Sequence, residues 1–99
     1  MGSSYGLIEV SGVVAAIDSL DAMCKAAEVS LVTWERKLGG RLVTIIVEGS
    51  VSDVKAAVEA AKNIAQANHH ILAASGVIAA PCEETRKIVA RCAKRIQKK

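Results

Sequence analysis

Two adjacent histidines and three cysteines are the side chains best suited to bind a metal ion or to act as nucleophiles: His69, His70, Cys24, Cys82 and Cys92. Adjacent residues on an extended segment point to opposite faces, so the two histidines are poorly placed to bind one ion. We predict that they form a polar connection between a helix and a strand. The cysteines are odd in number and lack the spacing of a metal site, which indicates reduced thiols in a cytosol. Cys24 and Cys92 fall on apolar helix faces, where a free cysteine acts as a small hydrophobe.

The combinations of residues that support catalysis are missing from the sequence. It contains no Ser/His/Asp or Cys/His pairing around a nucleophile, no phosphate-binding loop and no close pair of carboxylates in a glycine-rich cleft. We therefore expect a protein that is not an enzyme and that binds no metal and no cofactor.

A pair of glycines, Gly39 and Gly40, lies within the segment RKLGGR at residues 36–41. Adjacent glycines between two β-branched runs are typical of a hairpin turn. Lys37 and Arg41 flank the pair, and the residues alone allow both side chains to extend into solvent.

The composition fits one small domain. The chain has 99 residues, of which 52% are hydrophobic, and Tyr5 and Trp34 are its only aromatic residues. A domain of this size buries only roughly 60–70% of its unfolded surface. A surplus of apolar residues in so small a body suggests burial between subunits. The longest apolar runs fall well short of the ~20 residues of a membrane span, and MGSSYG lacks the features of a signal peptide, so we expect no membrane association.

The charge is unevenly distributed. Residues 1–85 contain six Lys and Arg against ten Asp and Glu, a net charge of −4, whereas residues 86–99 contain seven Lys and Arg and no acid, a net charge of +7. The basic segment could be a solvated amphipathic helix, or it could bind an acidic protein partner or nucleic acid. It has no aromatic residue for base stacking, which argues against sequence-specific nucleic-acid binding. We favour a protein partner.

Four strands are predicted, at residues 5–10, 29–35, 42–47 and within 71–80, the last of them placed at 76–79. Helices are predicted from Val13, from Ser50 to about Asn68, and from Glu83 onward. Ser50 and Asp53 resemble a capping box, and Glu83 and Glu84 suit a helix start. The predicted apolar faces are Val13, Ala16, Ile17, Leu20, Cys24 and Ala27 for the first helix, Val54, Ala57, Val58, Ala61, Ile64 and Ala65 for the second, and Ile88, Val89, Cys92 and Ile96 for the third.

This order of elements, β-α-β-β-α-β-α, predicts an α+β fold. It is a ferredoxin-like βαββαβ sandwich with two helices on one face of the sheet and an additional C-terminal helix. Ferredoxin-like domains serve many functions, and one of them is a regulatory module that binds small ligands between subunits.

Two stretches resemble one family. They are similar, in the same order, to motifs of the single-domain shell proteins of bacterial microcompartments. The two stretches are YGLIEVSGVVAAIDSLDAMCKAAEVSLV (residues 5–32) and GGRLVTIIVEGSVSDVKAAVEAA (residues 39–61). These are the hexameric facet proteins of carboxysomes and of propanediol and ethanolamine compartments. The resemblance covers about residues 5–81, which leaves residues 82–99 as a basic C-terminal helix or tail that could bind the helical tag of an encapsulated enzyme. A regulatory module would not need the chain of motifs from Glu9 to Val58.

The resemblance implies a roughly flat cyclic hexamer with a narrow central pore, which meets other shell proteins edge to edge in the bacterial cytoplasm. Lys37, Leu38, Gly39, Gly40 and Arg41 match the loop that lines the pore. At a pore rim, glycines expose backbone N–H groups and leave room for a solute. Lys37 and Arg41, six times repeated, would concentrate small anions. Pore cysteines, which hold an iron–sulfur cluster in some relatives, are missing from residues 36–41.

The outer edge also follows from the resemblance. Lys25 matches a lysine at the hexamer edge, and Ala79, Ala80 and Pro81 replace the Pro-Arg-Pro of many relatives. The arginine that usually accompanies the edge lysine is thus absent. The turn between Trp34 and Leu42 also carries one residue more than the common pattern. We expect less regular flat sheets, and a hexamer that could be distorted or screw-like.

Overall fold

The computed structural model describes residues 3–36 and 41–97, with side chains as far as Lys94. Its centre is one antiparallel sheet of four strands, β1 (Ser4–Ser11), β2 (Ser30–Arg36), β3 (Leu42–Gly49) and β4 (Leu72–Ile78), in the order β2-β3-β1-β4. The β2 and β4 strands are therefore the two edges. The α+β fold predicted from the sequence is confirmed.

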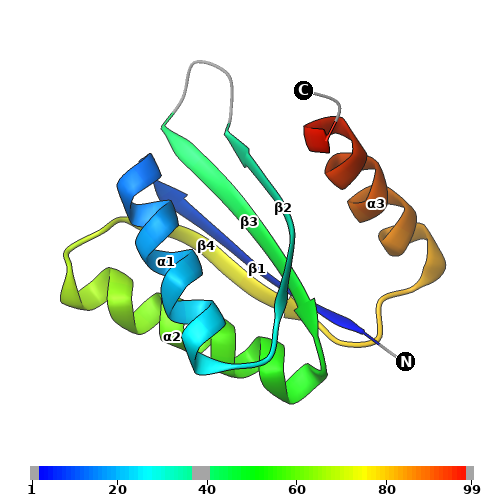
Figure 1. Ribbon diagram of the computed structural model, residues 1–99, viewed down its shortest axis with the longest axis horizontal. Helices are drawn as coiled ribbons and strands as arrows, with labels where there is room; N and C mark the ends of the chain where they lie inside the picture. Colours follow the sequence, from blue (N-terminus) through cyan, green and yellow to red (C-terminus); the bar gives the residue numbers. More distant parts are fainter. Residues whose placement is uncertain (1–2, 37–40, 98–99) are drawn as a thin grey trace.

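Three helices cover the two faces of this sheet (Figure 1). The helices α1 (Val13–Ala26) and α2 (Val51–Ala67) pack on one face, whereas α3 (Glu83–Gln97) packs on the other, against β2. On this second face α3 also reaches Tyr5 at the start of β1, whereas the surface beside β4 forms an open depression, and this open part matters for the site below.

The main core lies between the sheet and the first two helices. It joins Ile8, Val10, Val43, Ile45 and Val47 of the strands to the small and β-branched residues of α2, which are Val54, Ala57, Val58 and Ala61. Such residues allow close packing, and Gly6 shows how close it is, because a Cβ there would lie 3.0 Å from Cγ2 of Val58. The predicted apolar face of α2 is thus confirmed, with Ile64 half-buried.

The buried face of α1 differs from the prediction. Ala15, Ala16, Ser19 and Met23 face the core, whereas Val13, Ile17 and Cys24 of the predicted face are exposed. The reason is that α1 is apolar over a wider arc than the sheet can cover. Ala15, Ala16 and the unbranched Met23 turn inward. Val13, Ile17 and Cys24 are left on the flank.

The ends of α2 agree with the sequence. The Oγ of Ser50 accepts a hydrogen bond of 3.1 Å from the Asp53 amide, and the helix is capped at Asn68. The Asp53 carboxylate accepts from the Ser50 hydroxyl at 2.9 Å and from the amide of Glu28 at 3.4 Å, so it also holds the α1–β2 connection.

Two further predictions needed correction. The β4 strand begins at Leu72 rather than at residue 76, because its small side chains hide strand character that comes from pairing with β1. In α3, Val89 is buried and Cys92 is half-buried as predicted, but Ile88 is exposed because it lies on the flank of the helix. The side chain of Ile96 is outside the described part.

Candidate functional site

The hairpin end of the sheet carries the predicted pore loop. Residues 37–40, and with them the predicted pore positions Lys37, Leu38, Gly39 and Gly40, lie outside the described residues. The adjacent Arg41 and Arg36 are described and exposed, and Arg36 pairs with Val43 across the β2–β3 ladder. The amide of Gly12 donates to the Arg41 carbonyl at 2.7 Å, which fixes this end of the hairpin beside the start of α1.

A small pocket of about 280 Å³ opens at this place. Its lining comes from Gly12, Val13, Arg36, Arg41 and Val43. The start of α1 has no side-chain cap and no acidic residue in its first turn. The helix dipole and the two guanidinium groups therefore give this end of the molecule a positive potential.

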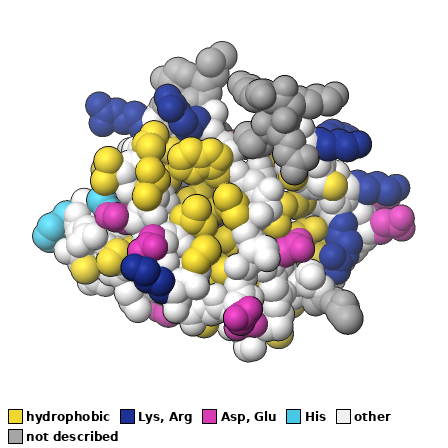
Figure 2. All heavy atoms as spheres, in the orientation of Figure 1, with side chains coloured by type: hydrophobic (Ala, Val, Ile, Leu, Met, Phe, Trp, Pro, Cys, Tyr) yellow, Lys and Arg dark blue, Asp and Glu magenta, His cyan; other side chains and the backbone are white. Residues whose placement is uncertain are grey.

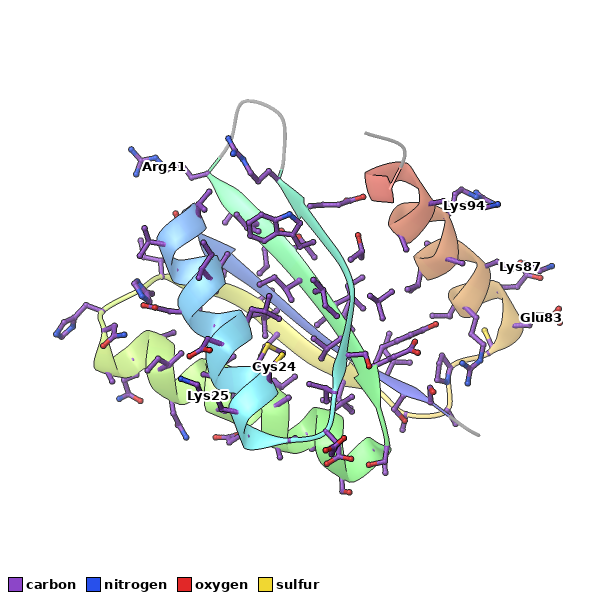
Figure 3. The ribbon with its side chains drawn as sticks, in the orientation of Figure 1. Cys24, Lys25, Arg41, Glu83, Lys87 and Lys94 are labelled. Atoms are coloured by element: carbon purple, nitrogen blue, oxygen red, sulfur yellow. The ribbon has the colours of Figure 1, made fainter. Side chains whose placement is uncertain are left out.

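The predicted edge residue Lys25 lies near the end of α1 and projects into solvent (Figure 3), with its side chain 76% exposed. Its Nζ lies 2.8 Å from Oδ2 of Asp21, one turn earlier. The hydrogen bond to Asp21, and then its charge, raise the pKa of Lys25. The pair keeps the lysine charged and directs it along the helix surface.

The other predicted edge residues follow β4. Ala79 and Ala80 are exposed, whereas Pro81 is buried. Ala80 has a φ of 49°, and its amide donates to Oγ of Ser4 at 3.3 Å. Within one subunit the structure does not bring Lys25 to this connection, which runs beside the start of β1 (Figures 1 and 3).

The histidines form a polar connection, as the sequence predicted. Nε2 of His70 lies 2.8 Å from Oδ2 of Asp18, and the side-chain Nδ2 of Asn68 donates to the same oxygen at 3.3 Å. The hydrogen bond to His70 is the main cause that lowers the pKa of Asp18. His69 is exposed, with a φ of 59°. Within the described ranges, His, Cys, Asp and Glu form no group of three or more that could hold a metal ion.

Two apolar surfaces of the structure were not predicted as functional sites from the sequence. The first is the α1 stripe, formed by Val13, Ile17, Leu20 and Cys24, of which Leu20 alone is half-buried and the rest are exposed. Figure 2 shows apolar side chains gathered over the first half of α1 and the adjacent β2. The sequence had identified this stripe, but as part of the core.

The second is the β4 groove, a depression of about 380 Å³ on the sheet face that α3 leaves open. Its lining residues are Leu7, Ile8, Glu9, Thr44, Ala74, Ser75, Gly76, Val77 and Ile78. The small residues of β4 make the depression, and they were the only sequence signal for it.

The outer face of α3 is basic. Lys87, Arg91 and Lys94 are exposed and border a shallow depression together with Ala90 and Ala93. Nζ of Lys87 lies 3.8 Å from the Glu84 carboxylate. No helix in the described part of the chain is long and apolar enough to span a membrane.

Comparison with known proteins agrees with this architecture. The model of the family described as "BMC domain" matches residues 4–81. The carboxysome shell protein CsoS1C of Hydrogenovibrio crunogenus is 42% identical over 90% of this chain and 86% of its own length. The microcompartment shell protein PduA of Citrobacter freundii is 43% identical over 87% of this chain and 90% of its own length.

A solved structure, that of a microcompartment protein from Desulfitobacterium hafniense, is similar with a TM-score of 0.77 and 25% identity. The match covers 93% of this chain and 49% of the other, so the chain spans about half the length of that structure. The protein described here therefore belongs to the BMC-domain family of bacterial microcompartment shell proteins.

Proposed function

We propose that this protein is a non-enzymatic building block of a microcompartment shell, which forms cyclic hexamers that tile the facets and leave a central pore for small metabolites. The observation that carries the proposal is the pair of unlike apolar surfaces on so small a subunit. Val13 and Ile17 of the α1 stripe are 36% and 56% exposed, and the β4 groove is open. Apolar patches of this kind on a small domain mark interaction sites.

Unlike surfaces favour a ring. A contact between two different patches is heterologous. Copies joined in this way close into a ring when each contact turns the next subunit by a whole fraction of a circle, one sixth for a hexamer, without rise. A two-fold dimer would instead use one self-complementary patch. The proposed number of six subunits per ring rests on the resemblance to hexameric facet proteins and not on the geometry of one subunit.

The hairpin end supports a pore for anions. Six copies of Arg36 and Arg41, together with six uncapped helix starts, would surround the axis with positive potential. Anionic metabolites would then be concentrated at the opening and cations repelled.

The exposed basic face of α3 is the surface proposed for a cargo enzyme. Lys87, Arg91 and Lys94 fall on one side of the helix, and Ile88 is 59% exposed on its flank. An acidic amphipathic helix would pair its carboxylates with these cations and its apolar side with Ile88.

Co-expression with the other shell proteins of a microcompartment tests the proposed role. A tagged copy of this chain should co-purify with assembled shells, and the same tag on an unrelated protein of equal size should not. If the tagged chain stays in the unassembled fraction, although its shells form, it is not a shell component.

A further inference from the structure

The last helix is an arm that crosses the sheet. Along the chain α3 follows β4, at one edge of the sheet, yet α3 packs beside β2, which is the other edge (Figure 1). Only the short connection 79–82 joins the two elements. It passes the start of β1, where the Ala80 amide donates to Oγ of Ser4 at 3.3 Å. The arm therefore packs on parts of the chain that are remote from its own strand.

This connection, which we call the hinge, is strained. Ala80 has a φ of 49°, in the left-handed region that disfavours a residue with a Cβ. Pro81 follows it, is buried and has a φ that its ring fixes. Strain of this kind persists only where the surrounding structure enforces it. Here the hydrogen bond to Ser4 and the docked helix enforce it.

The surface under the arm holds it by few buried groups. This surface, the α3 seat, consists of Tyr5, Leu7, Val32 and Ile46. Among the described side chains of α3, Val89 alone is buried. Thr33, which pairs with Ile46, is 3% exposed, and its hydroxyl has no hydrogen-bond partner in the described part of the chain. An unpaired buried hydroxyl weakens the docked state, because water would satisfy it once the arm opens.

We propose that α3 exchanges between two copies of this chain, so that the arm of each copy leaves its own seat and docks in the seat of the other. The contacts of the docked helix are then made between copies. They include the packing of Val89 and the hydrogen bond of 3.1 Å from Arg86 to the Ser3 carbonyl. Exchange of an identical element is a low-cost route to a two-fold contact, and a short hinge under strain favours it.

The exchange goes beyond the proposed shell role, because it would tie two rings together. The α3 seat lies on the face of the sheet opposite to α1 and α2, so an exchanged arm leaves the α1 stripe uncovered. The turn at Ala80 opens in both copies of a pair, which releases its strain twice. Both arms must first leave their seats, so the exchange should be slow and should need a high protein concentration.

Ile17→Glu is the simplest protein for the test, because a charge in the exposed α1 stripe should leave it monomeric. After incubation at high concentration, light scattering should show a dimer that persists for a time after dilution. Isotope-filtered NMR on a mixture of labelled and unlabelled protein then identifies the contact. Nuclear Overhauser effects should join the Val89 methyl groups of one copy to the Tyr5 ring of the other, since these two residues belong to one cluster.

Two substitutions at the hinge change its strain in opposite directions. Ala80→Gly removes the cost of the positive φ and should lower the association constant of the dimer by about tenfold or more, because both hinges contribute. Ala80→Val should raise the constant, since a β-branched residue tolerates this φ least. Ala79→Gly is the matched control, because Ala79 has no positive φ, and it should change the constant far less. Circular dichroism checks that each variant is folded, and Ala80→Gly suffices if Ala80→Val is not.

A protein that stays monomeric at high concentration would overturn the exchange. A dimer in which Val89 contacts Tyr5 only within one copy would overturn it too, because α3 would then have stayed in its own seat. Equal dimer formation by Ala80→Gly and its parent would show that hinge strain does not drive the exchange. A hexameric Ile17→Glu would contradict the proposed ring surfaces instead, and the same filtered NMR measurement on that hexamer would still decide the exchange.

Discussion

Gly49 lies where the end of β3 passes the connection between α1 and β2. A Cβ at this position would be 2.8 Å from the Glu28 carbonyl oxygen, which is a backbone atom that cannot turn aside. Gly49→Ala should therefore lower the free energy of unfolding by about 1–3 kcal/mol, measured by urea denaturation. Gly76→Ala is the control, since its Cβ meets nothing within the subunit, and it should change the stability of the isolated subunit within about 0.5 kcal/mol. Both variants are therefore compared in an Ile17→Glu background, in which a charge in the exposed α1 stripe should prevent assembly. Equal effects would show that Gly49 is not closely packed.

Asp18 links α1 to the end of α2 through His70 and Asn68. Its folded-state pKa is lowered from the ordinary value of 3.8. Its contribution to stability is therefore complete above that value and is lost as the pH falls through the lower folded-state pKa. The wild type should be more stable than Asp18→Asn at pH values above 3.8, and the difference should shrink in stronger acid.

Melting temperatures of both proteins over an acidic pH series measure this difference, with Glu59→Gln as a control for the loss of an exposed carboxylate. A difference that stays constant through the acid range would mean that ionised Asp18 does not stabilise the fold.

Among the elements, α2 was the easiest to predict from the sequence and α1 the hardest. Ser50 and Asp53 mark the start of α2, and its single apolar face fits the sheet. In α1, periodicity identified apolar residues but could not say which of them face the core of the subunit. The β4 strand was predicted too short because Ala73, Ala74 and Ser75 have little intrinsic strand preference.

The face of α1 can be tested by two adjacent substitutions. Met23 is fully buried and Cys24 is exposed. Met23→Ala should therefore lower the free energy of unfolding by about 2–5 kcal/mol. Cys24→Ala should leave the stability of the isolated subunit nearly unchanged. Urea denaturation makes this comparison in the Ile17→Glu background, where a charge in the exposed α1 stripe should leave the protein monomeric. The reverse order would mean that the face predicted from the sequence is the buried one.

For the whole molecule, the sequence predicted the fold and the family but not the two apolar surfaces that we propose as subunit contacts. The α1 stripe reads as core in a single sequence, and the β4 groove arises from strands that are distant in the chain, β1, β3 and β4. The predicted pore positions at residues 37–40 stay predictions, and so does the edge role of Lys25 and of residues 79–81.

The edge can be probed at Ala80. Both alanine and arginine carry a Cβ, so Ala80→Arg leaves the cost of the positive φ of 49° unchanged. It restores a charged hydrogen-bonding group, worth about 1.5–3 kcal/mol where it finds a partner. Because that contact would recur at every hexamer edge, Ala80→Arg should form larger flat sheets than the wild type in negative-stain microscopy. Ala79→Arg is the control for added charge. Extended, well-ordered sheets from the unmodified protein would contradict this prediction.

The mass of the purified, unmodified protein in solution tests the central claim most directly. Light scattering coupled to size-exclusion chromatography should give about six times the subunit mass of 10.3 kDa, unchanged on dilution within the micromolar range. A subunit can leave a ring held by six equivalent contacts only when two of those contacts break, so the ring should resist dilution. A stable monomer or a dimer over the same range would contradict the account of this protein as a hexameric shell building block.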